Sequence, residues 1–491
     1  MTSAVEPRLS RGLRDLLAEP MLARQRLIDT IRGVYELYGF VPLGTPAIEY
    51  LDVLKGSAGQ ETQQAIFTVA NPEGEALGLR FDLTVPLARV VAQYRDLPRP
   101  FRRYQVSPVW RADKPDKGRY REFIQFDLDS VGVESEIADT EIIAGMCDTL
   151  TALAVGPFRV RFSSRGILDL LLQAAAVPPA GAADVLRVLD KLEKVGLQKV
   201  KKELTTGYHD ESGDFIRGVG LAAEQVATIE SFLGIRADDR QAVVAELRAF
   251  FAALPAAGAA IDLVERISRQ LDDLGYAGDR VALDLSIARG LAYYTGPVFE
   301  AVLLDAPQFG SVFSGGRYDD LVLRFLGERV PATGASIGVD RLLAALVHLG
   351  RAGGRRSTAE VLVARIDPAL EGECLAMTYE LRRAGIPAEL YLGVEKGPGR
   401  QIKYADHTGV PIVLLYGSTE KERGIVTLKD MVAGRELAKK VDARGEWLAQ
   451  RPGQRTVPRA DLVAAVREML AAAGPPPAGG APAAAATAAA D

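Results

Sequence analysis

Residues 101–133 read FRRYQVSPVWRADKPDKGRYREFIQFDLDSVGV, and this pattern predicts a long β-hairpin. Two strand-like runs flank the loop ADKPDKGRY, in which Pro115 and Gly118 favour a turn. Short β-rich runs punctuated by Pro and Gly continue on both sides, from Phe40 to about Ser130. Most of their connections are too short for helical crossovers, so we expect a mainly antiparallel sheet.

The second run of this hairpin alternates between an apolar face and a polar one. Ile124, Phe126 and Leu128 fall on the apolar face, which must belong to a core. Arg111 reaches the other face from the first run. An aromatic ring, an amide and two carboxylates share that face: Phe123, Gln125, Asp127 and Asp129. Such a row is unusual for a solvated sheet and indicates a ligand site.

Positive charge is concentrated along the same hairpin. Residues 99–121 hold eight Lys or Arg against two Asp, a local charge of +6 in a chain of net charge −5. Arginine forks bind phosphate oxygens in pairs, so this density suits a polyphosphate or a nucleic-acid backbone. A solvated basic hairpin is the alternative reading of a charge run alone. The neighbouring carboxylate row favours the ligand site.

Further polar segments are candidates for the same site. In LGLRFDLTVP, alternation sets Arg80, Asp82 and Thr84 on one side of a strand, where a carboxylate and a hydroxyl could hold an ammonium group. In SGGRYDDLV and TGASIGVDRL, glycine-rich turns would allow close backbone approach to a ligand. Arg341 falls in the first turn of a predicted helix.

Another segment joins a basic residue to two aromatic ones. In VALDLSIARGLAYYTGPVFEAVL, Arg289 stands where a strand meets a glycine turn, and Tyr293 and Tyr294 follow it. A core aromatic pair is the ordinary explanation of two adjacent tyrosines. Because Arg289 is adjacent and the hairpin supplies Asp129, we prefer a pocket.

Changes in composition along the chain predict its domains. Residues 164–277 are rich in Leu, Ala, Glu and Lys at helical spacing, whereas strands alternate with helices beyond residue 358. The last residues are almost wholly Pro, Ala and Gly, which is typical of a disordered tail. The expected parts are one domain made of 1–163 and 278–350, a helical insertion at 164–277, an α/β domain at 358–442, a helical extension at 443–473 and a tail at 474–491.

The composition excludes several classes of protein. Hydrophobic residues at 48% and charged residues at 25% are ordinary for a folded globular chain. Cys147 and Cys374 match no disulfide or zinc spacing, and three histidines leave little material for a metal site. We find neither a secretory signal nor a run of about 18 apolar residues. We therefore expect a soluble, cytoplasmic protein without membrane or DNA partners.

The motifs together resemble the histidyl-tRNA synthetase family of class II aminoacyl-tRNA synthetases. The resemblance covers about 11–441. It implies an α+β fold in which a class II catalytic domain on a mainly antiparallel sheet carries a helical insertion and a C-terminal α/β anticodon-binding domain. The segments that carry it are GFVPLGTPAIEY, LRFDLTVPLARVV, VWRADKPDKGRYREFIQFDLDSVG, RGLAYYTGPVFEAVL, SGGRYDDLV and GASIGVDRL.

The resemblance also implies roles for individual residues. Arg111 and Arg289 would be catalytic, and Pro46 would lie at the interface of a homodimer. The implied ATP-binding residues are Arg111, Asp113, Arg119, Phe123 and Arg341. The implied histidine-binding residues are Asp82, Thr84, Arg111, Gln125, Asp129, Arg289, Tyr293 and Tyr294.

The implied reaction is the ATP-dependent ligation of L-histidine to tRNA(His) through a histidyl-adenylate, with release of AMP and pyrophosphate. The amino-acid carboxylate is itself an adequate nucleophile, so the step needs alignment and charge neutralisation more than a general base. Mg²⁺ is expected on the ATP phosphates, with no metal site built by the protein. The few histidines of the chain agree with this chemistry.

Three alternatives share part of the pattern. The synthetase-like regulatory subunit of ATP phosphoribosyltransferase has the same catalytic fold but lacks a C-terminal anticodon-binding domain, which we expect here. The threonyl and prolyl enzymes have a similar C-terminal domain, and RGLAYYTG argues against them. A simple RNA-binding module would not explain the carboxylate row.

Overall fold

A computed structural model describes residues 5–56, 64–116, 118–210, 213–288, 293–354, 356–394, 397–433 and 453–473. The chain divides into two compact units. The first contains Met1–Arg14 and Arg26–Leu349, and the second contains Asp15–Gln25 and Gly350–Asp491. No single described helix is long and apolar enough to cross a membrane, although the bent pair Arg165–Ala174 and Pro179–Leu189 reaches that threshold by length and composition together.

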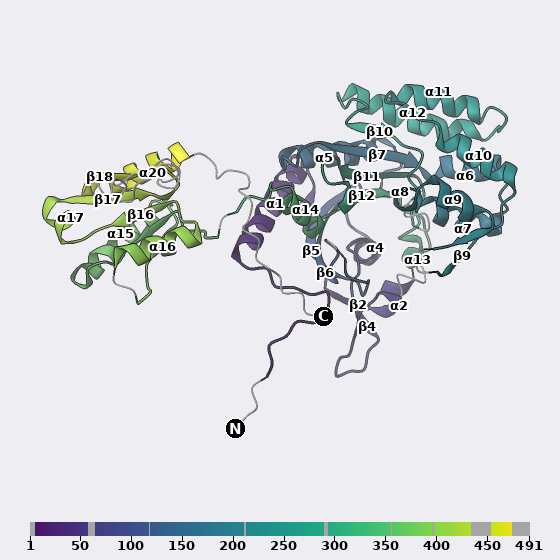
Figure 1. Cartoon of the computed structure of the whole chain (residues 1–491). Helices are drawn as coiled ribbons and strands as arrows, with labels where there is room; N and C mark the ends of the chain where they lie inside the picture. The colour runs from purple at the N-terminus through teal and green to yellow at the C-terminus, as the bar shows by residue number, and fades with distance from the viewer. Residues whose placement is uncertain are drawn as a thin grey trace. The chain divides into compact units, whose positions relative to one another are not determined.

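An eight-stranded sheet organises the first unit (Figure 1). The five pairings from β5 to β7 are antiparallel and only the two edge strands pair in parallel, which confirms the expected mainly antiparallel sheet. In sheet order the strands are β1 (Val41–Pro42), β5 (Phe101–Trp110), β6 (Glu122–Val131), β13 (Ala332–Gly338), β12 (Ser311–Arg317), β11 (Pro297–Leu303), β7 (Phe158–Ser164) and β10 (Val281–Leu283).

The predicted hairpin forms the first long pair of this sheet. Strands β5 and β6 pair over ten residues each, from Phe101 opposite Val131 to Trp110 opposite Glu122. Phe126 is fully buried, and its ring meets Tyr35 edge-on with centroids 4.9 Å apart. The alternation therefore sends the apolar side chains of β6 into the core, as expected.

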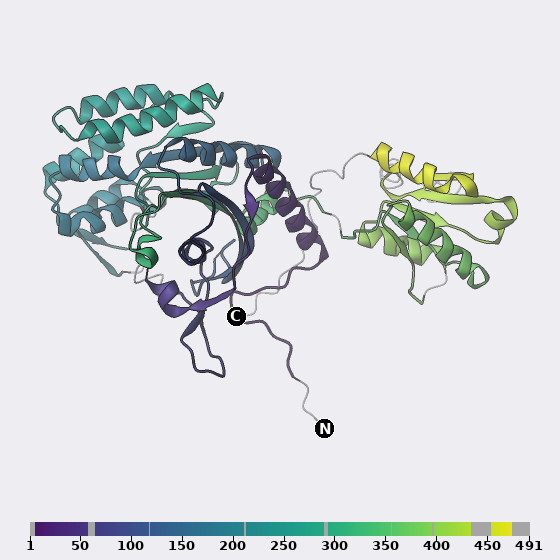
Figure 2. The same ribbon diagram turned by 180° about the vertical axis from the view of Figure 1, so that it is seen from behind.

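Helices cover the sheet on its two faces. Helix α5 (Ile137–Ala152) packs against strands β6, β7 and β11 to β13 and is buried along most of its length. Helix α4 (Thr84–Gln93) lies inside the curve of the sheet (Figure 2). Leu87, Ala88 and Val91 of α4 join a core cluster with Tyr318 and its neighbours. A small sheet is attached beside α4, made of β2 (Ile48–Tyr50), β4 (Leu77–Leu79) and β3 (Thr68–Val69) with helix α2 (Leu51–Lys55).

The segment between β7 and β10 is largely helical, as its composition predicts. It packs with the sheet through contacts of α12 and α6 with β7, and it belongs to the first compact unit. Its elements are α6 (Arg165–Ala174), α7 (Pro179–Leu189), α8 (Leu192–Val195), α9 (Leu197–Leu204), β8 (Gly207–His209), β9 (Phe215–Arg217), α10 (Ala223–Leu233), α11 (Arg240–Phe250) and α12 (Ala257–Asp273). Two helices follow later in the unit, α13 (Leu323–Leu326) and α14 (Val339–His348).

The second unit contains a five-stranded mixed sheet. Strands β15, β14 and β16 pair in parallel, whereas β16, β17 and β18 pair antiparallel. The strands are β15 (Ala388–Leu390), β14 (Val361–Val363), β16 (Ile412–Leu415), β17 (Ile425–Asp430) and β18 (Gln454–Pro458). The helices are α15 (Glu371–Arg383), α16 (Pro398–Thr408), α17 (Ser418–Arg423) and α20 (Leu462–Ala473).

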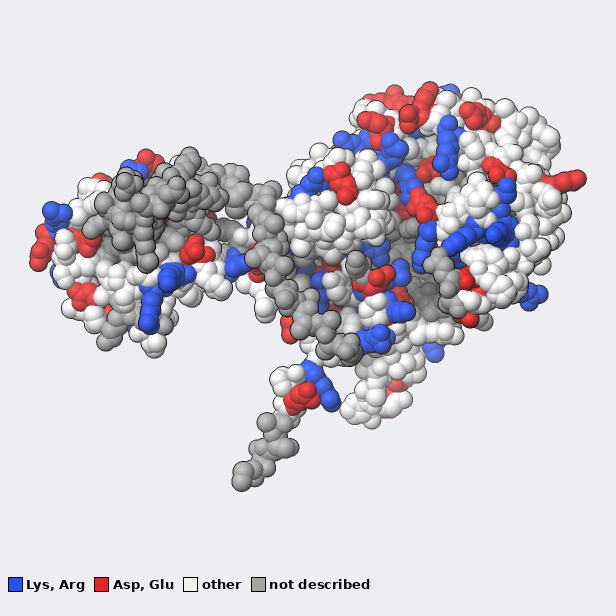
Figure 3. Space-filling model, viewed as in Figure 1, with Lys and Arg blue, Asp and Glu red and all other residues white. Residues whose placement is uncertain are grey.

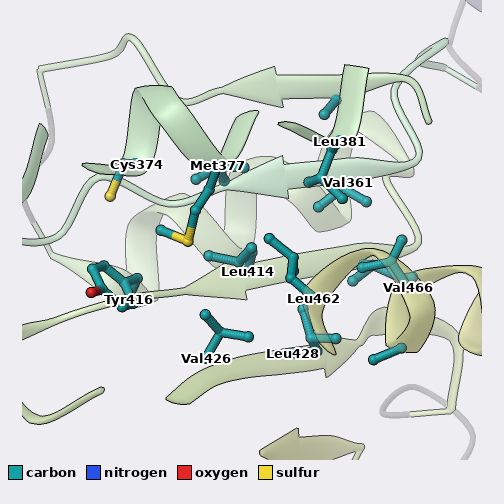
Figure 4. Packing of buried hydrophobic residues seen from close by; sticks show 14 of the residues in the cluster. Val361, Cys374, Met377, Leu381, Leu414, Tyr416, Val426, Leu428, Leu462 and Val466 are labelled. Atoms are coloured by element: carbon teal, nitrogen blue, oxygen red, sulfur yellow. The ribbon is translucent and has the colours of Figure 1, made fainter. Parts of the chain in front are cut away.

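The end of this unit differs from the sequence interpretation. We expected a helical extension over 443–473, separate from the α/β domain. Instead, Gln454–Pro458 is strand β18 at the edge of the sheet, and Leu462 of α20 is fully buried in the core (Figure 4). The helical spacing of Leu462–Ala473 was extended over this short run, although Thr456 and Val457 favour strand, and pairing with β17 satisfies its backbone. The tail at 474–491 lies outside the described residues.

Removing the Leu462 side chain tests whether α20 is part of this domain. We expect Leu462→Ala to lower the free energy of unfolding of the C-terminal unit by about 2–5 kcal/mol, because the change leaves a cavity in a dry core. Hydrogen exchange of the β14 and β16 amides in the full chain would measure this. Leu375→Ala, at an exposed position of α15, is the matched control. Unchanged protection in Leu462→Ala would mean that α20 is an appendage.

Candidate active site

The polar face of β6 lies between two strands with complementary side chains. In the register of β5, Arg103 is opposite Asp129, Gln105 is opposite Asp127 and Ser107 is opposite Gln125. On the other side, β13 places Ser336 opposite Asp127. The alternation predicted from the sequence thus becomes one continuous polar patch on the sheet.

A cavity of about 150 Å³ opens at one end of this patch. It brings together six residues that the resemblance assigned to substrates, from the hairpin and from α14. They are Arg111, Asp113, Arg119, Phe123, Gln125 and Arg341. The remaining wall contains small side chains of β12 and β13 and the hairpin residues Gly118 and Tyr120.

Arg111 is held in place by three neighbours. Its Nε donates a hydrogen bond to the carbonyl oxygen of Phe81 at 2.8 Å, and its Nη2 lies 3.5 Å from Oε1 of Gln125. Its guanidinium carbon lies 5.3 Å from the centre of the Phe123 ring. A cation and an aromatic face therefore stand side by side in the cavity, an arrangement suited to a phosphate joined to a flat base.

Arg341 enters the cavity from the first turn of α14, where the sequence predicted it. Its Nη1 donates to the carbonyl oxygen of Ser311 at 2.8 Å. The preceding residue, Asp340, accepts a hydrogen bond from the amide of Ile124 at 2.6 Å. The start of α14 is thereby tied to β6 between Phe123 and Gln125.

Beyond the cavity, the patch continues into a buried group of acidic residues. Asp127 and Asp129 are 1% and 2% exposed. Arg103, which is fully buried, lies 2.8 Å from Oδ2 of Asp129 and 3.9 Å from Oδ2 of Asp127. A buried carboxylate needs such a partner, since desolvation otherwise costs several kcal/mol. Tyr318 donates a further hydrogen bond to Asp129.

The charges of this group are not evenly balanced. Burial raises the pKa of Asp127 to about 7, the Arg103 charge lowers it, and the Asp129 and Asp82 charges raise it. Burial also raises the pKa values of Asp129 and Asp82, against the lowering effect of nearby arginines. Burial is the largest cause of each raised pKa, so a bound cation beside these carboxylates would favour their ionised forms.

The segment around Asp82 adopts a structure different from the predicted strand. Strand β4 ends at Leu79 and α4 begins at Thr84, so alternation does not apply across this stretch. The Asp82 carboxylate accepts a hydrogen bond from the amide of Val85 at 3.0 Å, in the first turn of α4. Asp82 still lies near the acidic group, since its charge raises the pKa of Asp127 and that of Tyr293.

Arg80 hydrogen-bonds mainly to the backbone beside the site, although its pKa, which burial lowers, also responds to the Asp127 charge. Its guanidinium donates to the carbonyl oxygens of Pro108, Thr45 and Pro46 at 2.9, 2.7 and 3.2 Å. It holds the chain near Pro46 against the end of β5. The expectation that Arg80 shares a face with Asp82 and Thr84 is therefore wrong.

The two tyrosines meet the acidic group from the opposite side. The rings of Tyr293 and Tyr294 pack edge to face with centroids 5.3 Å apart. Burial raises the pKa of both hydroxyls, and the next largest causes are the Asp82 charge for Tyr293 and the Asp127 charge for Tyr294. Both tyrosines therefore lie close to the carboxylates that the hairpin carries.

The glycine runs of SGGRYDDLV and TGASIGVDRL were predicted to form turns, but the structure differs. They lie within β12 and β13 and are not turns. A Cβ on Gly334 would stand 2.0 Å from Oδ1 of Asp129, and one on Gly316 would stand 2.8 Å from the Tyr294 ring. These glycines leave room for side chains of the site, where we expected room for a ligand.

Two members of the acidic group, Arg103 and Tyr318, escaped the sequence analysis. Asp127 was placed on the polar face of the hairpin, but no role of its own was assigned to it. The hairpin register, which sets Arg103 opposite Asp129, was a usable signal for the arginine. Arg289 lies outside the described residues, which resume at Tyr293. Among the described residues, no group of three His, Cys, Asp or Glu side chains is placed to hold a metal ion.

Both parts of the chain are similar to known proteins. A family model described as histidyl-tRNA synthetase matches residues 12–342, and one described as an anticodon-binding domain matches 360–469. Proteins named histidine--tRNA ligase from Cereibacter sphaeroides and Paracoccus denitrificans are each 44% identical, over 94% of this chain and 97% of their own length. The crystal structure of histidyl-tRNA synthetase from Nostoc sp. PCC 7120 aligns with a TM-score of 0.79 and 31% identity, over 95% of this chain and 100% of that one.

The raised pKa of Asp127 predicts a pH-dependent stability. In the unfolded chain this carboxyl ionises near pH 4, but in the folded protein only near pH 7. Wild-type stability should therefore fall as the pH rises through that window, whereas Asp127→Asn does not titrate. We expect the unfolding temperature of the variant, relative to wild type, to be about 2–4 °C higher at pH 8 than at pH 5. Thermal unfolding at the two pH values, with the exposed Asp273→Asn as control, measures this. The same difference in unfolding temperature between Asp127→Asn and wild type at both pH values would contradict the prediction.

Proposed function

The chain belongs to the histidyl-tRNA synthetase family, and on that premise we propose which of its residues carry out the reaction. The enzyme ligates L-histidine to tRNA(His) in an ATP-dependent reaction. As in class II synthetases generally, histidine is first joined to AMP as an adenylate and pyrophosphate is released. The amino-acyl group then passes to the tRNA, and AMP leaves.

ATP binds in the cavity between the hairpin and α14. The observation that supports this is the alignment of Arg111 with the Phe123 ring, 5.3 Å apart, in a cavity that Arg119 and Arg341 also line. Phe123 would stack on adenine and Asp113 would hold it, while Arg119 and Arg341 would bind the outer phosphates. Arg111 would contact the α-phosphate and the histidine carboxylate.

Histidine binds where the cavity meets the acidic group. Asp82 and Thr84, with Gln125, would hold the α-ammonium group, and Asp129 with Tyr293 and Tyr294 would hold the imidazole. The raised pKa values of Asp82, Asp127 and Asp129 support this assignment, because the cationic end of a bound zwitterion would favour the ionised carboxylates. Leucine or phenylalanine would leave these buried polar groups unpaired.

The first chemical step needs alignment and charge neutralisation. The histidine carboxylate attacks the α-phosphorus of ATP, a P–O bond forms, and the bond to pyrophosphate breaks. Negative charge that develops on the phosphate oxygens would be met by Arg111 and Arg289. No protein group needs to accept a proton in this step, because the attacking carboxylate is already ionised.

Mg²⁺ would reach the site on the ATP phosphates and would offset their charge. The donor set agrees with this route, since the described part of the cavity presents arginines and one carboxylate, Asp113, and no cluster of acidic ligands. Protein side chains would therefore orient the nucleotide, and the phosphates themselves would be the main metal ligands.

The remaining partners follow from the other parts of the chain. The C-terminal domain would bind the anticodon, and the helical insertion would approach the acceptor stem. Lys and Arg side chains gather over helices α7 to α9 of the insertion (Figure 3), which suits an RNA backbone. We also propose a cytoplasmic homodimer with Pro46 at its interface. The exposed apolar side chains of Val41, Ile48 and Tyr50 near Pro46 support such a contact.

Amino-acid-dependent exchange between ATP and pyrophosphate tests the function. We expect histidine to support the exchange and the other nineteen amino acids to fall about 10⁴-fold or more below it, as for sites that hydrogen-bond their substrate. A regulatory paralogue would show no exchange with any amino acid. Exchange supported by threonine or proline would point to another synthetase and overturn the proposal.

Arg289→Ala tests the transition-state role of this residue. We expect the variant to cut the rate of adenylate formation at saturating ATP and histidine by ~10² or more, because it loses a charge partner of the developing negative charge. Pyrophosphate exchange measures this rate. Arg217→Ala, an exposed arginine of β9, removes the same charge far from the chemistry and should match wild type. An unchanged rate in Arg289→Ala would remove Arg289 from the mechanism.

A further inference from the structure

A segment near the N-terminus lies against the hairpin loop that lines the ATP cavity. The carbonyl oxygen of Gly12 accepts a hydrogen bond from the amide of Arg121 at 2.9 Å, and the carbonyl oxygen of Arg11 accepts one from Nη1 of Arg121 at 3.4 Å. The approach is close, because a Cβ on Gly12 would stand 2.9 Å from Pro115 and from the Arg121 side chain. Gly12 also has φ +83°, which favours glycine. We call residues 10–14 the N-terminal strap.

Arg14 at the end of the strap bridges two walls of the cavity. Its guanidinium carbon lies 3.6 Å from the centre of the Tyr120 ring, and Tyr120 lines the cavity from the hairpin loop. Its Nη2 lies 2.8 Å from Oδ1 of Asp340, in the first turn of α14. The Arg14 side chain is 28% exposed and that of Asp340 only 4%, so the ion pair is partly shielded from water.

The second carboxylate oxygen of Asp340 extends this connection to β6. It accepts a hydrogen bond from the amide of Ile124 at 2.6 Å, and Ile124 lies between Phe123 and Gln125. The residue after Asp340 is Arg341, which lines the cavity. Asp340 therefore ties the helix wall to the strand wall, and Arg14 connects that carboxylate to the loop wall.

We propose that Arg14 is a positioning residue for ATP: it aligns Tyr120, Phe123 and Arg341 so that adenine and the outer phosphates meet their partners at the same time. Arg14 is not among the residues that line the cavity, so it acts through Tyr120 and Asp340. The loop that it holds carries Asp113 and Arg119, and a loop without this support would have to be ordered by the nucleotide itself. This inference rests on the proposed position of ATP in the cavity.

Loss of the Arg14 side chain should affect the binding of ATP and not that of histidine. The acidic group that would bind histidine is fixed by Arg103, Tyr318 and the sheet register, which do not involve the strap. Loss of Arg14 should therefore weaken the binding of ATP and leave that of histidine nearly unchanged. A residue with only a structural role would lower stability, or alter both substrates alike.

Steady-state pyrophosphate exchange on the full-length chain separates these cases. We expect Arg14→Ala to raise KM for ATP about tenfold, with kcat and KM for histidine changed less than about threefold. Arg14→Lys keeps the charge facing Asp340 and Tyr120 and should recover most of the affinity for ATP. Arg11→Ala is the matched control, because Arg11 is exposed and contacts Arg121 through its carbonyl oxygen, which the substitution keeps.

The outcomes are distinguishable from failure of the proposed function. If wild type shows no histidine-dependent exchange, the function itself is wrong. If wild type is active but Arg14→Ala changes the unfolding temperature alone, or raises both KM values equally, the positioning role is overturned. An Arg14→Lys variant as weak for ATP as Arg14→Ala, with the same unfolding temperature as wild type, would also count against it.

Discussion

The buried pairing of Arg103 with Asp129 across neighbouring strands is the interaction on which the rest of the site depends. Placing acids in the middle of a sheet is costly unless a cation shares their environment. The register of β5 and β6 puts Arg103 2.8 Å from Asp129 and 3.9 Å from Asp127. That register is fixed by Phe126 and Leu128 on the opposite face, which fit the core only in this alignment. Hydrophobic packing on one face thereby holds charge in place on the other.

The nearby arginines do not offset the desolvation of this group, and that imbalance links the structure to function. The buried carboxylates of Asp127 and Asp129 and the half-buried one of Asp82 have raised pKa values even with arginines nearby. Stability is thus given up at a place where a cationic substrate group can restore the balance. At the other end of the same strand, Arg111 and Arg341 leave an excess of positive charge. The two ends together match a zwitterion that faces a polyphosphate.

The surroundings of the site consist of distant segments held by short-range contacts. Gly334 and Gly316 make room for Asp129 and Tyr294, and α4 brings Asp82 toward the sheet because the same side chain caps the helix. The strap reaches the cavity through Arg14 and Asp340. Each of these contacts involves one or two atoms with little freedom to shift. The side chains of the site are therefore held in fixed positions, although they come from several strands and helices.

The sequence by itself determined the hairpin, its two faces, the helical insertion and the position of Arg341 in the first turn of a helix, because periods of 2 and 3.6 residues are local properties of the chain. It failed at 80–84, where the chain leaves β4 and enters α4, and at 454–458, where a strand that pairs with β17 had been included in a helical extension. Only the tertiary structure decided that Arg103 pairs with Asp129 and that Tyr318 hydrogen-bonds to the same carboxylate. It also decided that Arg14 pairs with Asp340, which lies 326 positions further along the chain. A local pattern reports which way a side chain faces, whereas its partner depends on which distant strand the packing of the core brings alongside.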